Sequence, residues 1–400
     1  MTSSLELASD QTAQARLTAV RPTWCAVRRV ADIVSGDTRT VFHAGPPFES
    51  AGDIPPPLRH SICVAGVYEG WADDFAAAAR LLDDGAIQTA SAQDHGLLVP
   101  LAGVLSPGMA VLEVRDAASS SSTAVVHVAI NEGQAHATRL GLLDAALPNH
   151  LRWLNGPFAD WLAQCVRQPL ALAPLMAQAL RDGDDCHART VAGSRLLAKA
   201  LLRDAPTGAV TDAARDFIAV SPAFALNPWM AAAALWLRAA EGVPGCSWVS
   251  RAGGNGLSFG VQLAGQPGRW ITSPAPVPAG TCEPAHAARH AIGALGDSAV
   301  VDFLGLGGQA LAHAPILRNA LEASLPDDVL ERPHDILAAP GVLDGLARSV
   351  TNAQRCVRSG CGPLVLIGMI DAAGEAGRIG AGVVDVPVAL FRAALASLPS

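Results

Sequence analysis

The feature that most limits the possible folds is a change of pattern along the chain. Between about residues 151 and 244 the alternating pattern of strands disappears, and alanine- and leucine-rich segments with helical spacing replace it. Strand patterns return on both sides. The sequence therefore predicts a mixed α/β, multi-domain protein, with an N-terminal α/β domain over 1–150, a helical domain over 151–244 and a C-terminal α/β domain over 245–400.

The individual elements follow from periodicity and turn residues. Short β-branched and apolar runs predict strands at residues 24–30, 40–43, 109–114, 124–130, 364–370 and 382–386. Helical spacing predicts helices at residues 71–82, 173–180, 191–202, 211–218, 227–240, 297–321 and 388–395, with an irregularity of the 297–321 helix at residues 305–308 left open. The serine run at 119–122 predicts a turn, and Asn255-Gly256 predicts a tight hairpin turn because both residues tolerate positive φ.

Composition and charge exclude several classes of protein. Half of the 400 residues are hydrophobic, 16% are charged, and the formal net charge is −8 with no basic run, so nucleic acid is not an expected partner. The sequence shows neither a secretory signal pattern nor an apolar run long enough for a membrane span, so we expect a cytoplasmic protein. The eight cysteines form no CxxC pair and are expected to be free thiols. Lys199 is the one lysine, so an anion site would depend on arginine or backbone N–H groups.

The block GDDCHART (183–190) carries the densest set of chemically active side chains. If it is helical, the spacing places Asp184 beside His187 and Asp185 beside Arg189. His187 would then transfer protons while Asp184 orients it, and Arg189 would bind an anion while Asp185 holds it. The alternative is a first helical turn with acidic residues at its positive end and a surface ion pair. No third local ligand completes a metal site.

Three further loops carry candidates. Asn131 and Glu132 follow the strand at 124–130, where loops of α/β sheets collect ligands, although capping of a following helix would select the same residue types. His95 is a candidate general base or oxyanion donor, or else a buried histidine with satisfied hydrogen bonds. His43 ends a short strand before Gly-Pro-Pro, which suggests a pocket rim or a plain turn.

The segment from 250 to 300 supplies the remaining candidates. Arg251 and Asn255 lie at the polar tip of the predicted hairpin, which we expect to form a pocket wall. Asp297 or Ser298 would cap the helix that begins there, or the free N–H groups of that helix would receive an anion. The glycines at 305–308 lack the spacing of a dinucleotide fingerprint and favour close packing. We expect the hairpin, GDDCHART, INEG (130–133) and DHG (94–96) to converge on one cleft.

Several of these blocks together resemble one protein family. The segments NGLSFGVQLAG (255–265), RWITSPAPVPAG (269–280) and LGDSAVVDFLGLGGQALAHAP (295–315) are similar to a bacterial family of conserved domains of unknown function. That family includes a subunit of oxamate carbamoyltransferase in anaerobic allantoin breakdown, a route of purine catabolism. The resemblance covers roughly residues 20–395. Gln93-Asp94 and Gly253-Gly254 depart from the family pattern, which is often richer in histidine before His95 and has arginine before Asn255.

The resemblance implies a transferase that moves a carbamoyl group between the nitrogen of a small anionic amide and phosphate, with no cofactor. It also implies partner subunits, one of them similar to succinyl-CoA synthetase, and is compatible with a homo-oligomer. The alternatives are a non-catalytic organising subunit and a metal-assisted amide hydrolase. The predicted catalytic residues are His187, Asp184, His95, Asn131 and Glu132. The predicted substrate-binding residues are His43, Asp185, Arg189, Arg251, Asn255, Asp297 and Ser298.

Overall fold

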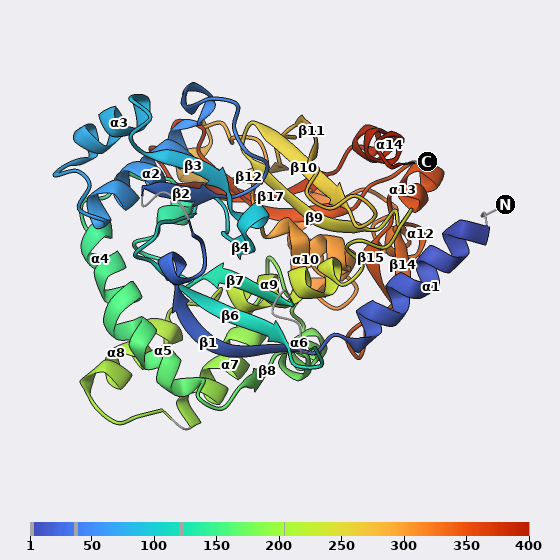
Figure 1. The fold of residues 1–400 in the computed structure, drawn as a ribbon, viewed down its shortest axis with the longest axis horizontal. Helices are drawn as coiled ribbons and strands as arrows, with labels where there is room; N and C mark the ends of the chain where they lie inside the picture. The colour runs from blue at the N-terminus through green and yellow to red at the C-terminus, as the bar shows by residue number, and fades with distance from the viewer. Residues whose placement is uncertain (1–3, 36–38, 120–123, 204, 400) are drawn as a thin grey trace.

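The computed structural model describes residues 4–35, 39–119, 124–203 and 205–399. Several small sheets occupy the interior, and helices surround them (Figure 1). The helices α4, α5 and α8 lie along the lower left of the view, and α13 and α14 lie at the upper right. The mixed α/β class predicted from the sequence is confirmed.

The N-terminal region contains two sheets. The larger has the order β4-β7-β6-β1-β8, and the smaller has β2 between β3, which is parallel to it, and β5, which is antiparallel. Its strands are β1 (Pro22–Arg29), β2 (Thr40–His43), β3 (Gln88–Ser91), β4 (Leu97–Leu98), β5 (Val104–Leu105), β6 (Ala110–Asp116), β7 (Val125–Ala129) and β8 (Leu170–Ala171). Its helices are α1 (Ser4–Ala19), α2 (Pro56–Tyr68) and α3 (Phe75–Asp83).

The four strands predicted in this region are confirmed, each within two residues at its ends. The helix predicted from residue 71 begins later, at Phe75, because the Asp74 side chain accepts the Ala77 N–H and caps the helix there. Residues 120–122 of the serine run lie outside the described residues.

The middle region is almost entirely helical. Its helices are α4 (Leu147–Trp153), α5 (Ala159–Cys165), α6 (Ala173–Arg181), α7 (Val191–Arg203), α8 (Ala209–Ala219) and α9 (Leu226–Arg238). The four helices predicted between 173 and 240 are confirmed, whereas α4 and α5 were not predicted. A π-helical turn at Leu154–Phe158 joins α4 to α5. Pro157 lies inside this turn and has no N–H to donate, which favours the wider helical bonding.

The C-terminal region has three small sheets. The predicted hairpin is β9 (Val249–Asn255) with β10 (Ser258–Leu263), and it belongs to a sheet of order β11-β10-β9-β13. The strands are completed by β11 (Ile271–Pro274), β12 (Ala279–Cys282), β13 (Leu295–Gly296), β14 (Leu337–Pro340), β15 (Arg348–Thr351), β16 (Leu364–Ile370) and β17 (Arg378–Asp385). The helices are α10 (Ala299–Leu304), α11 (Pro315–Leu321), α12 (Arg332–Ile336), α13 (Ala353–Ser359) and α14 (Val388–Ala396).

The helix predicted for 297–321 is not continuous, and it breaks at the glycines 305–308 where an irregularity was expected. It divides into α10, a 3-10 turn at Gly307–Gln309, and α11. Gly305 adopts a left-handed backbone with φ of 113°, and Gly308 donates its N–H to the Asp302 side chain instead of continuing a helix. Glycine permits this geometry at low steric cost, and the chain therefore leaves the helix after one and a half turns.

One hydrophobic cluster runs through all three regions and includes Trp24, Phe158, Trp229 and Phe303. Helix α9 lies within it, since every residue from Asn227 to Leu237 is buried. The helix packs against β7 and α10, so it joins the N-terminal sheet to the C-terminal region. Within the described residues, no helix has the length and apolarity needed to cross a bilayer.

Candidate functional site

Two clusters of buried polar groups lie at the two ends of α10. Asp297 precedes the helix and Asp302 lies within it, and both side chains are fully buried. A carboxylate removed from water is unfavourable unless hydrogen-bond donors or cations face it. The partners of these two residues therefore show which distant segments the fold brings together.

The first cluster joins the loops after β2 and β3 to the start of α10. The N–H of Gly45 and the side-chain amide of Gln93 donate to Asp297 Oδ1 at 2.9 and 2.7 Å, and the N–H of Val99 donates to Oδ2 at 3.0 Å. Burial raises the pKa of Asp297 to about 7 against the opposing effect of these donors. The Asp297 side chain therefore links three segments that are distant in the sequence. One alternative predicted that this side chain caps α10, and it does not.

The tip of the hairpin belongs to the same cluster. Asn255 accepts the N–H groups of Leu257 and Ser258, which closes the predicted turn, and its amide donates to the Pro46 carbonyl at 2.8 Å. Gly45 has φ of 72°, and a Cβ there would lie 2.4 Å from the Gly254 carbonyl carbon. The turn after β2 therefore packs directly on the hairpin backbone.

The second cluster pairs His187 with Asp302. His187 Nδ1 lies 2.6 Å from Asp302 Oδ2, and both side chains are almost wholly buried. The N–H groups of Gly308 and Leu366 donate to the other oxygen, Oδ1, at 2.9 and 3.2 Å. Burial alone lowers the pKa of His187, but the carboxylates of Asp302 and Asp185 outweigh burial and raise it. The imidazole is therefore biased toward its protonated, proton-donating form.

The predicted helix over GDDCHART is wrong, and so are its side-chain pairs. Residues 184–190 form a loop in which Cys186 has φ of 67°. The Asp185 carboxylate accepts the N–H groups of residues 187, 188 and 189, which a helix would direct to carbonyls. His187 is therefore oriented by Asp302 rather than Asp184. The guanidinium of Arg189 lies nearest to Asp184, at 3.6 Å, rather than to Asp185.

The INEG loop also differs from its predicted form, because no α-helix begins there before residue 147. The Asn131 amide donates to the Ala223 carbonyl at 2.9 Å and to Asn227 Oδ1 at 3.2 Å, so Asn131 does not cap a helix. Glu132 accepts the N–H and hydroxyl of Thr138 and the N–H of Arg139, which closes the loop on itself.

The loop at 184–190 and the INEG loop meet on one segment. Thr190 donates its hydroxyl to the Pro222 carbonyl at 3.1 Å, one residue before the carbonyl that receives the Asn131 amide. Asn227, at the start of α9, returns a hydrogen bond to the Ala129 carbonyl at 2.7 Å. Two motifs that are far apart in the sequence are thereby held against the residues that lead into α9.

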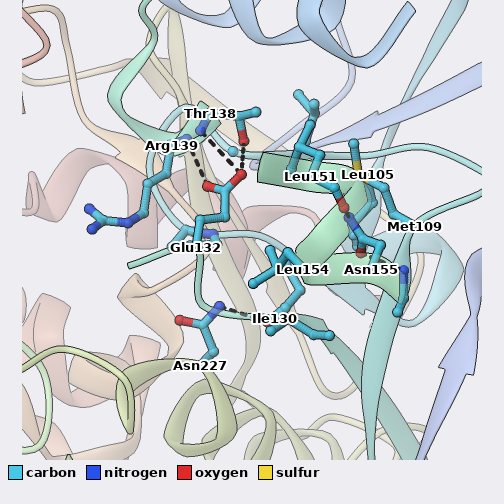
Figure 2. Close-up of a pocket in the computed structure, with 15 residues that line it drawn as sticks. Leu105, Met109, Ile130, Glu132, Thr138, Arg139, Leu151, Leu154, Asn155 and Asn227 are labelled. Atoms are coloured by element: carbon cyan, nitrogen blue, oxygen red, sulfur yellow. Dashed lines mark hydrogen bonds between the residues drawn. The ribbon is translucent and has the colours of Figure 1, made fainter. Parts of the chain in front are cut away.

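A small pocket lies between the INEG loop, the loop after β4 and the π-helical turn (Figure 2). Glu132, Thr138 and Arg139 line one side, Leu154 and Asn155 of the π-helical turn line another, and Asn227 lies below. Insertions of this kind into helices are frequent at functional sites. Of the predicted site residues, Glu132 lines this pocket, whereas His187, Asn255 and Asp297 lie outside it.

The loop at 99–103 connects the pocket to the Asp297 cluster. Val99 donates to Asp297, and Pro100 and Gly103 line the pocket. Leu101 between them has φ of 48°, an uncommon backbone state for a residue with a side chain. Such strained residues gather at functional sites, so this loop is the centre of the candidate site.

For each of the two remaining histidine candidates, one of the two predicted alternatives is wrong. His95 is exposed, with its ring edge-on to Phe42 at 5.0 Å, so the buried alternative is wrong. His43 is fully buried and does not form a rim. Its Nδ1 lies 2.8 Å from the Ala44 carbonyl and must carry the proton there, and burial lowers the pKa of His43 to about 4. His43 is therefore neutral at physiological pH.

Arg251 and Ser298 lie at the edges of the first cluster. Arg251 pairs with Glu241 at 3.0 Å and Asp94 at 3.7 Å and donates to the Gln93 carbonyl, so its charge is already compensated. Ser298 is buried and lies in helical conformation at the start of α10, where its side chain makes no capping hydrogen bond. Among the described residues, no group of three or more His, Cys, Asp or Glu side chains is placed to hold a metal ion.

Three residues of these clusters were not selected from the sequence. Asp302 had one available signal, because a lone aspartate inside the apolar run AVVDFLGL must find partners if it is buried. Gln93 and Arg139 carry no such signal, since an amide or a guanidinium is ordinary at a surface.

Comparison with known proteins places the chain in a family. The family model for "Oxamate carbamoyltransferase subunit AllG" matches residues 87–298, which is more than half of the chain. Two Escherichia coli K12 proteins are each 27% identical to it. One is oxamate carbamoyltransferase subunit AllG, with 94% of each chain covered, and the other is the uncharacterized protein YahG, with 97% of this chain and 85% of YahG covered. The crystal structure of a conserved protein of unknown function from Enterococcus faecalis V583 superposes with a TM-score of 0.90 at 25% identity, covering 99% of both chains. The chain belongs to the family of the oxamate carbamoyltransferase subunit AllG.

Proposed function

We propose that this chain is a catalytic subunit of a carbamoyltransferase complex that moves a carbamoyl group between a small anionic amide and phosphate. Family membership supports the reaction, with oxamate as the amide. One structural observation carries the catalytic role, namely the buried pair of His187 and Asp302 at 2.6 Å. A buried carboxylate this close to an imidazole raises the proton affinity of the ring, which is the tuning that a general acid requires.

The chemistry assigns His187 a definite step. In phosphorolysis of oxalurate, which is oxamate carrying the carbamoyl group on nitrogen, a phosphate oxygen attacks the carbamoyl carbon. The bond from that carbon to the oxamate nitrogen breaks, and the nitrogen must receive a proton as it leaves. Against the effect of burial, Asp302 and Asp185 raise the pKa of His187, which favours the protonated ring; in this proposal the ring supplies the proton in phosphorolysis and takes it back in the reverse direction.

Six other residues of the candidate site take one of two roles in this proposal. Asn131, Asn255 and Asp297 are positioning residues, because their polar atoms already bond to main-chain groups of neighbouring loops. His95 is exposed and Arg139 is half-buried at the pocket, so a ligand or a partner subunit can reach these two, whereas the buried Glu132 shapes the pocket wall. Partner subunits complete the assembly.

A second candidate is an organising subunit whose partners carry out the chemistry. The observation that favours it is that the buried Asp297 carboxylate links distant segments, because Gly45 and Gln93 donate to one of its oxygens and Val99 donates to the other. The two candidates differ in what they predict for His187. Removal of the imidazole stops turnover only if this chain is catalytic.

The test is reconstitution of the chain with its co-encoded partners, followed by an assay for carbamoyl phosphate formed from oxalurate and phosphate. His187→Gln is expected to lower turnover by at least ~100-fold, the usual contribution of a general acid. His136→Gln is the matched control, because His136 also pairs with an aspartate, Asp144, at 2.6 Å but is exposed. Subunit association and circular dichroism confirm that each variant is folded.

The outcomes separate the proposals. Unchanged turnover in His187→Gln would assign the chemistry to a partner, and a wild-type assembly that forms no carbamoyl phosphate would remove the substrate assignment. The wild-type pH profile gives a readout that needs no variant. In the direction of phosphorolysis, kcat/KM should fall as the pH rises through the raised pKa of His187.

A further inference from the structure

Arg139 has an unusual environment for an arginine. Its Nη2 donates to the Gly133 carbonyl at 2.6 Å, while its Nε is buried and has no hydrogen-bond partner. No ion pair of its guanidinium occurs among the described residues. The nearby carboxylate of Glu132 is already engaged by Thr138 and by the Arg139 N–H. A guanidinium has five N–H donors, so Arg139 retains donors that no carboxylate of the described residues accepts.

Arg139 is held on the strained loop of the candidate site. Ala102 donates its N–H to the Arg139 carbonyl at 3.1 Å, and Arg139 lines the pocket beside Gly103. In Figure 2 its side chain extends away from Leu105 and Met109, past Glu132. The stem therefore forms the pocket wall and the guanidinium lies at its edge.

A second arginine approaches from the C-terminal region. The turn between β16 and β17 packs on the segment after Arg139, since a Cβ on Gly377 would lie 3.2 Å from the Leu142 side chain. Arg378 follows that turn. Burial and the positive charge of Arg378 lower the pKa of Arg139, against the attraction of Glu132. Arg378 forms an ion pair with Glu283 at 2.9 Å, whereas among the described residues the guanidinium of Arg139 forms none.

We propose that Arg139, within the positive field of Arg378, binds the oxyanion group of a ligand of this chain, either the carboxylate of an oxamate-type amide or phosphate. This inference rests on the proposed function for the identity of the ligand and deepens it by naming the group that recognises the charge. A planar guanidinium matches both oxyanions with two parallel N–H donors. The anion would also relieve the repulsion between the two arginines.

The loop that carries Arg139 is held in place by hydrogen bonds to the Glu132 side chain. The Glu132 side chain fixes the N–H groups of Thr138 and Arg139, so the arginine stem starts from a rigid position. Rigid placement of a binding side chain lowers the ordering cost of ligand capture. Arg139 is thus a specificity residue for charge.

The experiment is isothermal titration calorimetry on the full chain with two probes, inorganic phosphate and oxamate. Arg139→Met is expected to weaken binding of one or both anions by at least tenfold, and Arg139→Lys is expected to recover part of the loss, because lysine keeps the charge but not the paired donors. Arg29→Met is the matched control. Arg29 also donates to a backbone carbonyl, of Gly108, at 2.6 Å, and it does not line the pocket of Figure 2.

The probe that loses affinity identifies the source of the oxyanion. The proposal is overturned if wild type binds neither probe, if Arg139→Met leaves both affinities within twofold, or if Arg29→Met weakens binding equally. Failure of the proposed reaction can be told apart from failure of the anion site. If anion binding depends on Arg139 but the complex forms no carbamoyl phosphate, the substrate assignment is removed and the anion site is retained.

Discussion

The pair of His187 and Asp302 permits a quantitative prediction by a double-mutant cycle. The perturbations are His187→Gln, Asp302→Asn and both together. The side chains are 4% and 0% exposed with 2.6 Å between Nδ1 and Oδ2, so removing one partner leaves the other buried without its counter-charge. Breaking a buried pair in this way costs about 3–5 kcal/mol of unfolding free energy. We expect each single variant to lose that amount, with a coupling energy of ~2 kcal/mol or more.

The protein contains its own control for this cycle. His136 and Asp144 are also 2.6 Å apart, but their side chains are 46% and 32% exposed. Water screens this pair and solvates either partner when the other is removed. The coupling energy from His136→Gln and Asp144→Asn should therefore stay below ~1 kcal/mol.

Urea denaturation of all variants at several pH values checks both the size and the sign. Because the folded pKa of His187 lies above the unfolded value of 6.5, the stabilisation is fully present below pH 6.5 and is lost as the pH rises through the folded pKa. A buried-pair coupling no larger than that of the exposed pair would refute the assignment. So would a coupling that grows between pH 6 and 9.

Two further predictions concern α10 and its surroundings. Gly307→Ala should lower the unfolding free energy by ~3 kcal/mol, because its Cβ would lie 2.1 Å from the immobilised Asp302 Oδ1. The control is Gly268→Ala, which also has positive φ but open space around it and should lower the unfolding free energy by only ~1 kcal/mol. Equal shifts of the melting temperature in the two variants would contradict this reasoning. The pKa of Asp297 is raised from 3.8 to about 7, so its stabilising contribution is complete below pH 3.8 and is lost as the pH rises to 7. The difference in unfolding free energy between wild type and Asp297→Asn should change across that window by ~4 kcal/mol, measured by denaturant titration, and a pH-independent difference would count against it.

Short-range patterns determined much of the fold. The strand at Leu364–Ile370 and the helix starting at Val388 follow from alternation and helical spacing over fewer than ten residues. The turn at Asn255 likewise follows from the short amide side chain and the glycine after it. Each of these choices depends on neighbours in the sequence, which is why a pattern of residue types suffices to predict them.

The same reasoning failed where a buried group selects a partner from another part of the chain. GDDCHART has a plausible helical spacing, but Asp185 takes the N–H groups of its own loop and His187 pairs with Asp302, which lies on a different element. The glycine at 305 ended a helix that the apolar pattern alone would have extended to residue 321.

The sequence by itself determined the order of strand-rich and helix-rich regions, the hairpin with its turn, and the list of polar residues available for chemistry. Only the tertiary structure decided which of them meet: Gly45 and Asp297 are 252 positions apart and share a hydrogen bond of 2.9 Å. The physical reason is that spacing along a chain specifies contacts one helical turn or one strand pair away. A buried charge is stabilised by whichever donors the packed core brings to it.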